Sequence, residues 1–403
     1  MQREADIDSI ELFGGGGGLG LGLARAGFRS VAFLEWDDDA VETVRHNRGN
    51  GVEHIADWRI LHQDARKASW TPYIGSLALV CGGPPCQPFG IGGKQAGHAD
   101  IRDMWPEAIR AVCESLPEAF LFENVRNLAG PKFRPYLEWI ECSLRHVLAG
   151  GRSGESHLQH LGRLKANPPP IDYRTSVSVV NAADFGAPQE RRRILVVGIR
   201  ADLRQDPGHP EPTHTKDRLL WDQWVSGDYW TRHGLAKPSD PAIPKPHAGA
   251  VRRLRACLVP PPGKPWVTLR DAIADLGTPN GRNFHSLQNG ATIYPGHTGS
   301  PLDWPAKALK AGDHGVPGGE NMIRFADGSV RYFTLRESAR LVGLPDSYTF
   351  PRSWTESMRA LGNAVPAQLA EAAGKWLRER LTQANGANSP ATTKHQTNGK
   401  RAA

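Results

Sequence analysis

The sequence predicts an α/β fold built on a parallel sheet that helices cover on both faces. Three observations lead to this prediction. Short apolar runs alternate with helical patterns through residues 1–200, a glycine-rich stretch follows the first apolar run, and residues 201–328 are crowded with prolines. The alternation is typical of parallel strands joined by helices. The change of texture after residue 200 indicates a separate, irregular domain with extended loops.

Six apolar runs have the length and composition of short buried strands. They lie at residues 9–13, 30–35, 77–83, 119–125, 175–182 and 193–199. Helical spacing between them predicts helices at residues 19–26, 40–47 and 104–115, and regular helix returns at residues 334–344 and 366–384. Residues 385–403 are polar and low in apolar side chains, so we expect a disordered tail.

Composition excludes several classes of protein. At 403 residues the chain is long enough for one large domain or a large and a small one, and 39% hydrophobic with 23% charged residues is typical of soluble globular proteins. No apolar run approaches the ~20 residues that span a bilayer, and no signal pattern opens the chain. We therefore expect a cytoplasmic protein without membrane contact. Five scattered cysteines predict neither a disulfide framework nor a metal site.

The formal net charge of +7 favours a polyanionic partner only weakly. The glycine-rich stretch is more informative. Residues 14–18 are five consecutive glycines between a strand and a helix, where backbone can approach a ligand closely. Glu35 and Trp36 end the next predicted strand, and Asp64 stands where a third strand would end.

An acid at the end of the second strand suits a ribose diol, and an aromatic ring beside it can stack on a purine. These strand ends therefore predict an adenosine pocket. A plain glycine turn with solvated acids is the simpler alternative. NAD is the second candidate ligand, because Gly20 completes a GxGxxG pattern.

The stretch "CGGPPCQPFG", residues 81–90, holds the thiol of Cys86 in a stiff loop with little side-chain bulk. Only a thiolate is nucleophilic, and prolines can aim it while glycines leave room for a planar substrate. An ordinary strand-end cysteine is the alternative. The next strand ends in Glu123-Asn124, and "QERRR" at residues 189–193 leads into the one after. A thiol, a carboxyl and a guanidinium can thus meet at the carboxyl edge of the sheet.

Several motifs occur here in the order found in DNA (cytosine-5) methyltransferases, which the chain resembles over nearly its whole length except the proline-rich region and the tail. They are "ELFGGGGGLGLGLARAGF", "GGPPCQPFG", "ENV", "QERRR", "TLRESARLVGLPDSY" and "LGNAVP". The resemblance is to bacterial members of restriction-modification type. It implies a Rossmann-like S-adenosylmethionine-dependent methyltransferase domain from residues 1–200 and 329–384. It also implies a smaller irregular target-recognition domain at residues 201–328, here called the Pro-rich segment.

The resemblance implies a role for each catalytic candidate. Cys86 would add to C6 of cytosine, and Glu123 would hold the N3 edge and stabilise the charge that develops. Arg193 would bind O2 of the base, and Arg191 would support its loop. The cytosine would be flipped out of the duplex, and a loop over residues 89–102 would close behind it.

Other residues would hold the cofactor or lie on the substrate side. The resemblance places Gln87 and Asn124 on the substrate side, with Asn124 ordering the proline-cysteine loop. Those that would line S-adenosylmethionine are Phe13, Gly15, Gly17, Gly18, Glu35, Trp36, Asp64, Pro84, Asn363 and Val365. Glu11 stands where the family usually has Asp, and Gly90 where it usually has Ser.

The partner implied is double-stranded DNA, acted on by a monomeric DNA (cytosine-5-)-methyltransferase; whether a separate restriction endonuclease accompanies it stays open. The same chemistry on transfer RNA is one alternative, although a large variable insert favours DNA. An NAD-linked oxidoreductase is another, and would leave the Cys86 and Glu123 motifs unused. Polar groups of the Pro-rich segment suit base reading, with a phosphate clamp as the alternative: Arg252, Arg253, Arg255, Arg282, Asn283, His285, Gln288 and His297. The target sequence cannot be read from one chain.

Overall fold

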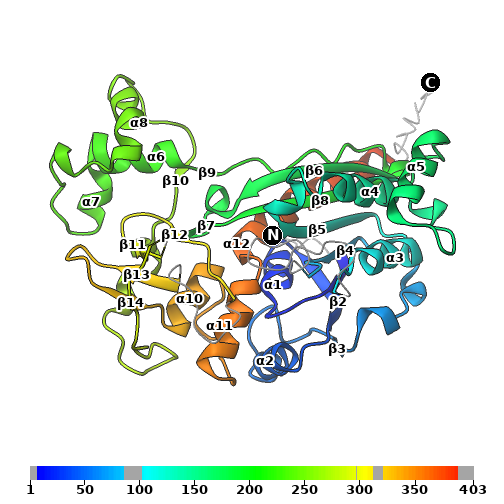
Figure 1. Ribbon diagram of the computed structural model, residues 1–403, viewed down its shortest axis with the longest axis horizontal. Helices are drawn as coiled ribbons and strands as arrows, with labels where there is room; N and C mark the ends of the chain where they lie inside the picture. The colour runs from blue at the N-terminus through cyan, green and yellow to red at the C-terminus, as the bar shows by residue number, and fades with distance from the viewer. Residues whose placement is uncertain (1–6, 86–101, 296, 312–320, 389–403) are drawn as a thin grey trace, which may run out of the picture.

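The computed structural model describes residues 7–85, 102–295, 297–311 and 321–388. Its centre is a seven-stranded sheet of order β3-β2-β1-β4-β5-β8-β6 (Figure 1). The strands are β1 (Ile7–Leu12), β2 (Phe28–Glu35), β3 (Ile60–His62), β4 (Leu79–Gly82), β5 (Ala119–Val125), β6 (Tyr173–Asn181) and β8 (Arg192–Arg200). All six predicted runs form strands, within two residues at either end.

The prediction of an all-parallel sheet was wrong at one strand. β8 runs antiparallel to both β5 and β6, whereas β1, β2, β3, β4 and β5 pair in parallel. The connection from β6 to β8 holds only a short 3-10 turn (Ala182–Phe185) and β7 (Gln189–Glu190). Parallel strands need a crossover of a dozen or more residues. A connection this short reverses the chain direction, so β8 must run antiparallel to β6. The apolar composition of a strand does not indicate its direction.

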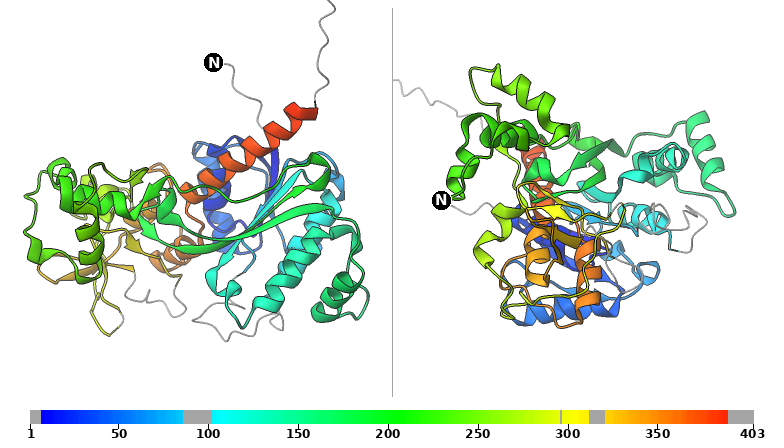
Figure 2. Two further views of the ribbon diagram at one scale, coloured as in Figure 1. Left: turned by 90° about the horizontal axis from the view of Figure 1, so that it is seen from above. Right: turned by 60° about the vertical axis from the view of Figure 1, so that its left-hand side comes forward.

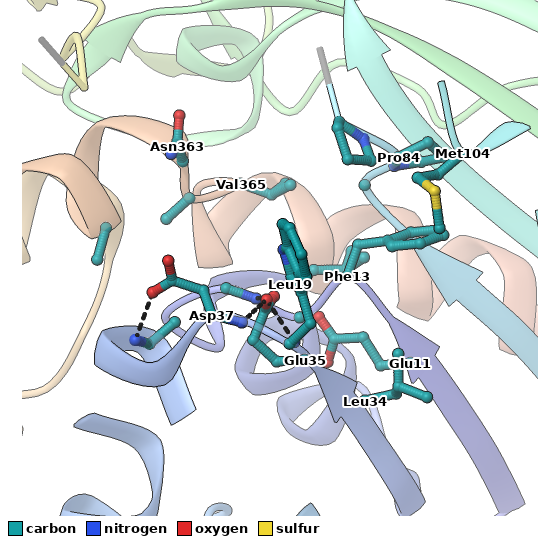
Figure 3. Close-up of a pocket in the computed structure, with 18 of the residues that line it drawn as sticks. Glu11, Phe13, Leu19, Leu34, Glu35, Asp37, Pro84, Met104, Asn363 and Val365 are labelled. Atoms are coloured by element: carbon teal, nitrogen blue, oxygen red, sulfur yellow. Dashed lines mark hydrogen bonds between the residues drawn. The ribbon is translucent and has the colours of Figure 1, made fainter. Parts of the chain in front are cut away.

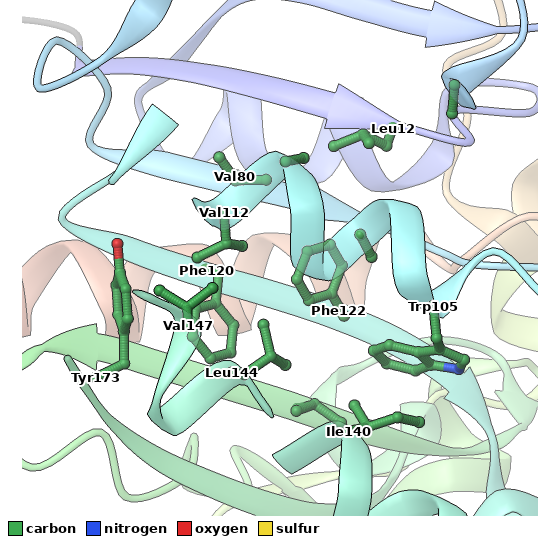
Figure 4. Close-up of a cluster of buried hydrophobic side chains, with 14 of the residues drawn as sticks. Leu12, Val80, Trp105, Val112, Phe120, Phe122, Ile140, Leu144, Val147 and Tyr173 are labelled. Atoms are coloured by element: carbon green, nitrogen blue, oxygen red, sulfur yellow. The ribbon is translucent and has the colours of Figure 1, made fainter. Parts of the chain in front are cut away.

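Helices cover both faces of the sheet, as predicted, because successive side chains of β5 point to opposite faces. Phe120 and Phe122 pack in a core with α3 (Trp105–Ser115) and α4 (Arg134–Arg145), which Figure 4 shows. Ala119 and Leu121 pack in a second core with α1 (Gly18–Arg25) and α12 (Ala367–Asn388). Figure 2 shows α12 lying along that second face. α2 (Asp38–Gly49) and α5 (His157–Ala166) are further α-helices of this part of the chain.

The Pro-rich segment is more helical than expected. It contains α6 (Lys216–Trp221), α7 (Asp228–Arg232), α8 (Lys245–Arg255) and α9 (Leu269–Ile273). Its strands are β9 (His214–Thr215), β10 (Lys264–Pro265), β11 (Ser300–Pro301), β12 (Ala306–Lys307) and β13 (Met322–Arg324), and β14 (Val330–Tyr332) follows it. Proline in the first turn of α8 and a capping box at Thr268 before α9 start helices rather than break them. Buried tryptophans, among them Trp224, Trp230 and Trp266, form a core around α6, α7 and α8, whereas Leu269, Ile273 and Leu309 pack in the core of α10 (Leu335–Val342) and α11 (Trp354–Asn363).

The C-terminal helices return to the first glycine loop, as the sequence predicts. α10 and α11 precede α12, and the Tyr348 hydroxyl donates to the Gly16 carbonyl at 3.0 Å. α12 continues through Asn388, past the expected start of the tail at residue 385. The rest of that expected tail, residues 389–403, lies outside the described residues. Within the ranges that the structure describes, no helix is both long enough and apolar enough to cross a membrane.

Candidate active site

A cavity of about 500 Å³ opens at the carboxyl ends of β1, β2, β4 and β5, and the turn after α11 closes one side of it (Figure 3). Its volume suits a ligand of nucleoside size. Most of the predicted site residues line it: Phe13, Gly15, Glu35, Trp36, Asp64, Pro84, Glu123, Arg191, Arg193, Asn363 and Val365. The structure therefore brings together strand ends and a C-terminal turn that are far apart in the sequence.

Two predicted cofactor contacts, Gly17 and Gly18, are not among the residues that line the cavity. Gly17 precedes α1 with φ of 79°, a conformation that side chains other than glycine rarely adopt. A Cβ on Gly18 would lie 2.3 Å from the Val365 carbonyl oxygen. These glycines allow the first loop to turn and the C-terminal turn to approach, so their role is to shape the site.

Cys86, Gln87, Gly90 and nearly all of the predicted closing loop lie outside the described residues. Pro84 and Pro85, the last described residues before Cys86, both line the cavity.

The Glu35 carboxylate is held by three backbone amides. Its Oε2 accepts from Gly15 at 2.8 Å, and its Oε1 accepts from Trp36 at 2.7 Å and from Asp37 at 2.8 Å. Two carboxylate oxygens offer about four acceptor positions, so one remains for a ligand hydroxyl. The neighbouring Trp36 is 66% exposed although it lines the cavity. A fixed acceptor beside a free aromatic face suits a ribose and its attached base.

Asp64 is already engaged by a side chain that the sequence analysis did not single out. Arg66 Nη2 lies 2.6 Å from Asp64 Oδ2, and the Arg66 amide donates to Asp64 Oδ1 at 3.0 Å. The hydrogen bonds from Arg66 lower the pKa of the Asp64 carboxyl below its usual value. Asp64 therefore presents a charged, fixed edge to the cavity. The sequence signal for this ion pair was its spacing, since Asp64 and Arg66 are only two residues apart.

Glu11 lines the same cavity and is buried at 3% exposure. Burial raises the pKa of its carboxyl well above the usual value, the Gly20 amide offsets part of that rise, and the nearby Glu35 carboxylate adds to it. Among the described residues no donor reaches its Oε2. An acid inside the apolar run "SIELF" was the signal for this residue.

The other end of the cavity holds a buried acid and a cation. Arg193 Nε lies 2.6 Å from Glu123 Oε1, and both side chains are at most 15% exposed. The N–H is not aligned for a hydrogen bond, and within the described ranges Oε1 has no hydrogen-bond partner. Arg193 instead donates through Nη1 to the Arg192 carbonyl at 2.9 Å. The Glu123 carboxylate can therefore still accept a hydrogen bond, and the Arg193 guanidinium can still donate one, at the same end of the cavity. Such a combination suits the polar edge of a planar base.

Two predicted residues act as braces. Asn124 is buried and donates through Nδ2 to the Pro84 carbonyl at 3.0 Å, a contact of the kind expected if it orders the proline-cysteine loop. It is not among the residues that line the cavity. Arg191 donates to the carbonyls of Leu309 at 3.0 Å and Gly362 at 2.8 Å. These bonds join Arg191 to the segment before residue 312 and to the end of α11, as expected for a residue that supports its loop.

The sequence analysis did not predict one wall of the cavity. Arg352, Glu356 and Arg359, on or just before α11, line it, and Arg352 is paired with Asp39 of α2. Their spacing of three or four residues is that of one helix face. Only the tertiary return of the C-terminal helices brings that face to β2, so local pattern could not assign it to the site.

Some polar groups proposed for base reading are not available for it. His285 is 2% exposed, and its ring nitrogens lie 2.9 Å from Thr334 Oγ1 and 3.3 Å from the Gly277 carbonyl oxygen. Asn283 accepts from Arg336 through its side chain. The prediction for His285 was wrong, because it is buried against the start of α10, whereas Asn283 is exposed and its side-chain oxygen is engaged by Arg336. Arg253 and Arg255 are exposed but paired with Asp217 and Asp240, whereas Arg252 and Arg282 are exposed.

Comparison with protein families gives a match over most of the chain. The family model described as C-5 cytosine-specific DNA methylase matches residues 7–147, 157–229 and 289–379. Its longest internal gap, residues 230–288, falls inside the Pro-rich segment. The type II methyltransferase M.NgoMIV of Neisseria gonorrhoeae is 30% identical over 381 residues, which cover 94% of this chain and 99% of that protein. The type II methyltransferase M.Eco47II of Escherichia coli is 28% identical over 378 residues, with 93% and 80% coverage.

The fold is similar to that of solved methyltransferases. The structure of S. pombe Dnmt2 methyltransferase superposes with a TM-score of 0.54 at 17% identity, covering 93% of this chain and 99% of that chain. This likeness confirms the Rossmann-like α/β architecture that the motifs predict.

Proposed function

The chain belongs to the C-5 cytosine-specific DNA methylase family, and from this premise we propose that it methylates C5 of a flipped cytosine in double-stranded DNA through a covalent Cys86 adduct. The methyl donor is S-adenosylmethionine. One observation carries the proposal: a single cavity joins the Glu35 carboxylate at one end to the Glu123–Arg193 pair at the other. A methyl donor and a base held at these two ends would meet inside it.

The residues present fit S-adenosylmethionine, which supplies an electrophilic methyl group when bound. Glu35 keeps acceptor capacity for the ribose hydroxyls, and Trp36 offers a free ring face for adenine. Asp64 keeps a charged edge there. Asn363 and Val365 lie on the far side of the cavity from Glu11 in the view of Figure 3. They would close over the methionine part, as the resemblance implies.

At the other end the reaction follows from the chemistry of cytosine. The Cys86 thiolate forms a bond to C6, and the ring electrons that this displaces collect at C5, N3 and O2. A proton donated by Glu123 to N3 would neutralise the negative charge there, and Arg193 would stabilise charge at O2. C5 would then take the methyl group, and the electron pair of the broken S–C bond would stay on the donor's sulfur. Transfer of the C5 proton to water, departure of the thiolate from C6 and return of the N3 proton to Glu123 would restore the aromatic ring.

The Pro-rich segment is proposed to choose the DNA site, since the residues around the cavity serve the flipped base and offer nothing to its neighbours. The gap in the family match at residues 230–288 supports this, because a part that differs between relatives is suited to differing targets. We further propose that the protein acts as a monomer on cellular DNA and that a separate endonuclease shares its site. The names of its type II relatives support the last point.

The proposal is tested by incubating the purified protein with labelled S-adenosylmethionine and either random-sequence duplex DNA or transfer RNA. We expect 5-methylcytosine in DNA alone, at one short sequence. Label in transfer RNA would instead favour the RNA alternative. Tight binding of NADH without methyl transfer would favour the oxidoreductase, which the family match does not support.

Glu35→Ala is expected to weaken S-adenosylmethionine binding by about 1.5–3 kcal/mol, the usual contribution of a hydrogen bond to a charged group. Titration calorimetry measures it. Glu35→Gln, which keeps an acceptor for the backbone amides, should fall between Glu35→Ala and wild type. Glu53→Ala, on an 88% exposed side chain, is the control. Equal affinity of Glu35→Ala and wild type would contradict this placement of the cofactor.

Exchange of residues 201–328 for the matching part of a relative with a known, different target is expected to move methylation to the relative's site. Methyl transfer should persist, because Cys86, Glu123 and Arg193 all lie outside the exchanged residues. Sequencing of methylated random DNA measures the site. An active hybrid that kept the original site would show that the segment only clamps phosphates.

A further inference from the structure

An indole of the Pro-rich segment donates a hydrogen bond to β7, the short strand just before the site arginines. Trp304 donates through Nε1 to Glu190 Oε1 at 2.7 Å. The ring of His247 stacks on Trp304 with centroids 4.3 Å apart and planes at 21°. Trp266 packs edge-on against it at 5.7 Å. The indole is therefore fixed from two sides, and its N–H has one direction in which to donate.

Glu190 lies directly before the arginines of the candidate site. It ends β7 and is followed directly by Arg191 and then by β8, which carries Arg193. β7 pairs in parallel with β12, where Ala306 donates to the Pro188 carbonyl at 2.9 Å. β7 is not part of the seven-stranded central sheet but has β12 as its partner in a separate two-stranded sheet. Its position thus depends on residues 304–309 of the Pro-rich segment.

Because Arg193 lies three residues after the end of β7, we expect its orientation to depend on the position of β7 as well. The Arg193 backbone pairs with Val125 of β5 and Val180 of β6, and its guanidinium donates to the Arg192 carbonyl at 2.9 Å, so β7 can influence the guanidinium only through residues 190–192. Small displacements of a positioned group cost much of its catalytic effect. A bond that fixes β7 one step before Arg191 can set where Arg193 points.

We propose that Trp304 is a positioning residue for methyl transfer. Its N–H holds Glu190, and through β7 it keeps Arg193 aligned with Glu123 on the flipped base. The inference rests on the proposed function and adds to it. The segment that reads the DNA site would thus also help to position the arginine that receives the base.

The test compares two tryptophan substitutions that each remove one indole hydrogen bond. Trp304→Phe removes the donor to Glu190. Trp230→Phe removes a donor to the Gln223 carbonyl at 2.7 Å, entirely within the Pro-rich segment. Under saturating duplex, Trp304→Phe should lower kcat about tenfold, the order of change for one lost hydrogen bond to a charged group, with the Kd for DNA within twofold. Trp230→Phe should lower the Tm and leave kcat within twofold.

Two further variants separate positioning from general damage. Glu190→Gln keeps an acceptor for the indole and should retain most of the rate, whereas Glu190→Ala should lose as much as Trp304→Phe. In an Arg193→Ala background, Trp304→Phe should have no further effect, because the residue through which it acts is gone.

Full additivity with Arg193→Ala, or equal kcat losses for Trp304→Phe and Trp230→Phe, would overturn the inference. So would a native kcat for Trp304→Phe. Absence of methylation by the wild-type protein would instead refute the proposed function, so the two failures are distinguishable.

Discussion

Cys86→Ser is expected to abolish both methylation and covalent trapping on duplexes that carry 5-fluorocytosine at the target. A serine hydroxyl is not ionised at neutral pH, so C6 would lack its nucleophile, and a loss on the order of 10⁴-fold or more is expected for a residue of this kind. Fluorine at C5 cannot leave as a proton does, so the wild-type adduct should persist. Denaturing gels with labelled duplex and cofactor measure the trapped fraction.

Cys142→Ser is the matched control, because Cys142 of α4 is half-buried and burial raises the pKa of its thiol. It should trap as the wild type does. Cys81 is unsuited to attack for the same reason: it is buried, its pKa is raised well above the usual value, and its thiol donates to the Ile10 carbonyl. Trapping by Cys86→Ser would mean that a different nucleophile acts, and the covalent step assigned here would be wrong.

Sequence patterns were sufficient to locate those strands whose burial is visible as a continuous run of apolar residues. β5 was predicted with its observed bounds, since a strand buried on both faces reads as a continuous apolar run that ends in polar letters. The same rule placed Glu35 and Glu123 at the carboxyl edge, because strand ends of a parallel sheet meet there. The glycine loop and the C-terminal turn were located by motif and meet as expected.

Features that depend on tertiary partners could not be read in this way. The face of α11 with Arg352 and Arg359 meets the cofactor end only through the return of the C-terminal helices. The antiparallel course of β8 follows from a short connection rather than from any residue type.

His285 shows the same limit in the Pro-rich segment. A polar side chain in an irregular stretch was taken as exposed, yet it is buried against Thr334. Polar residues in loops often satisfy buried backbone groups, and only contacts distinguish these from residues that face a partner. Trp304 is a further case, since nothing near it in the sequence points to Glu190.

Glu123→Gln is expected to lower kcat by about 10²–10⁴-fold, the usual contribution of a positioned acid or base. Attack of Cys86 at C6 places negative charge on N3, and an amide cannot transfer a proton to that nitrogen as a carboxylic acid can. The base should still be bound, because Gln keeps the size of Glu and Arg193 remains 2.6 Å from this position. Single-turnover methylation separates the chemical step from product release.

The neighbouring cation makes the design of this test important, because removing one partner of a buried ion pair can destabilise the protein on its own. Melting temperature and S-adenosylmethionine affinity should therefore be measured on the same samples, with Glu138→Gln on the exposed side of α4 as the control. If Glu123 and Arg193 act on one ring, Glu123→Gln combined with Arg193→Ala should cost less than the sum of the single changes. A native single-turnover rate for Glu123→Gln would exclude Glu123 as the group that stabilises N3. Arg193 would then be left to stabilise the adduct at O2 alone.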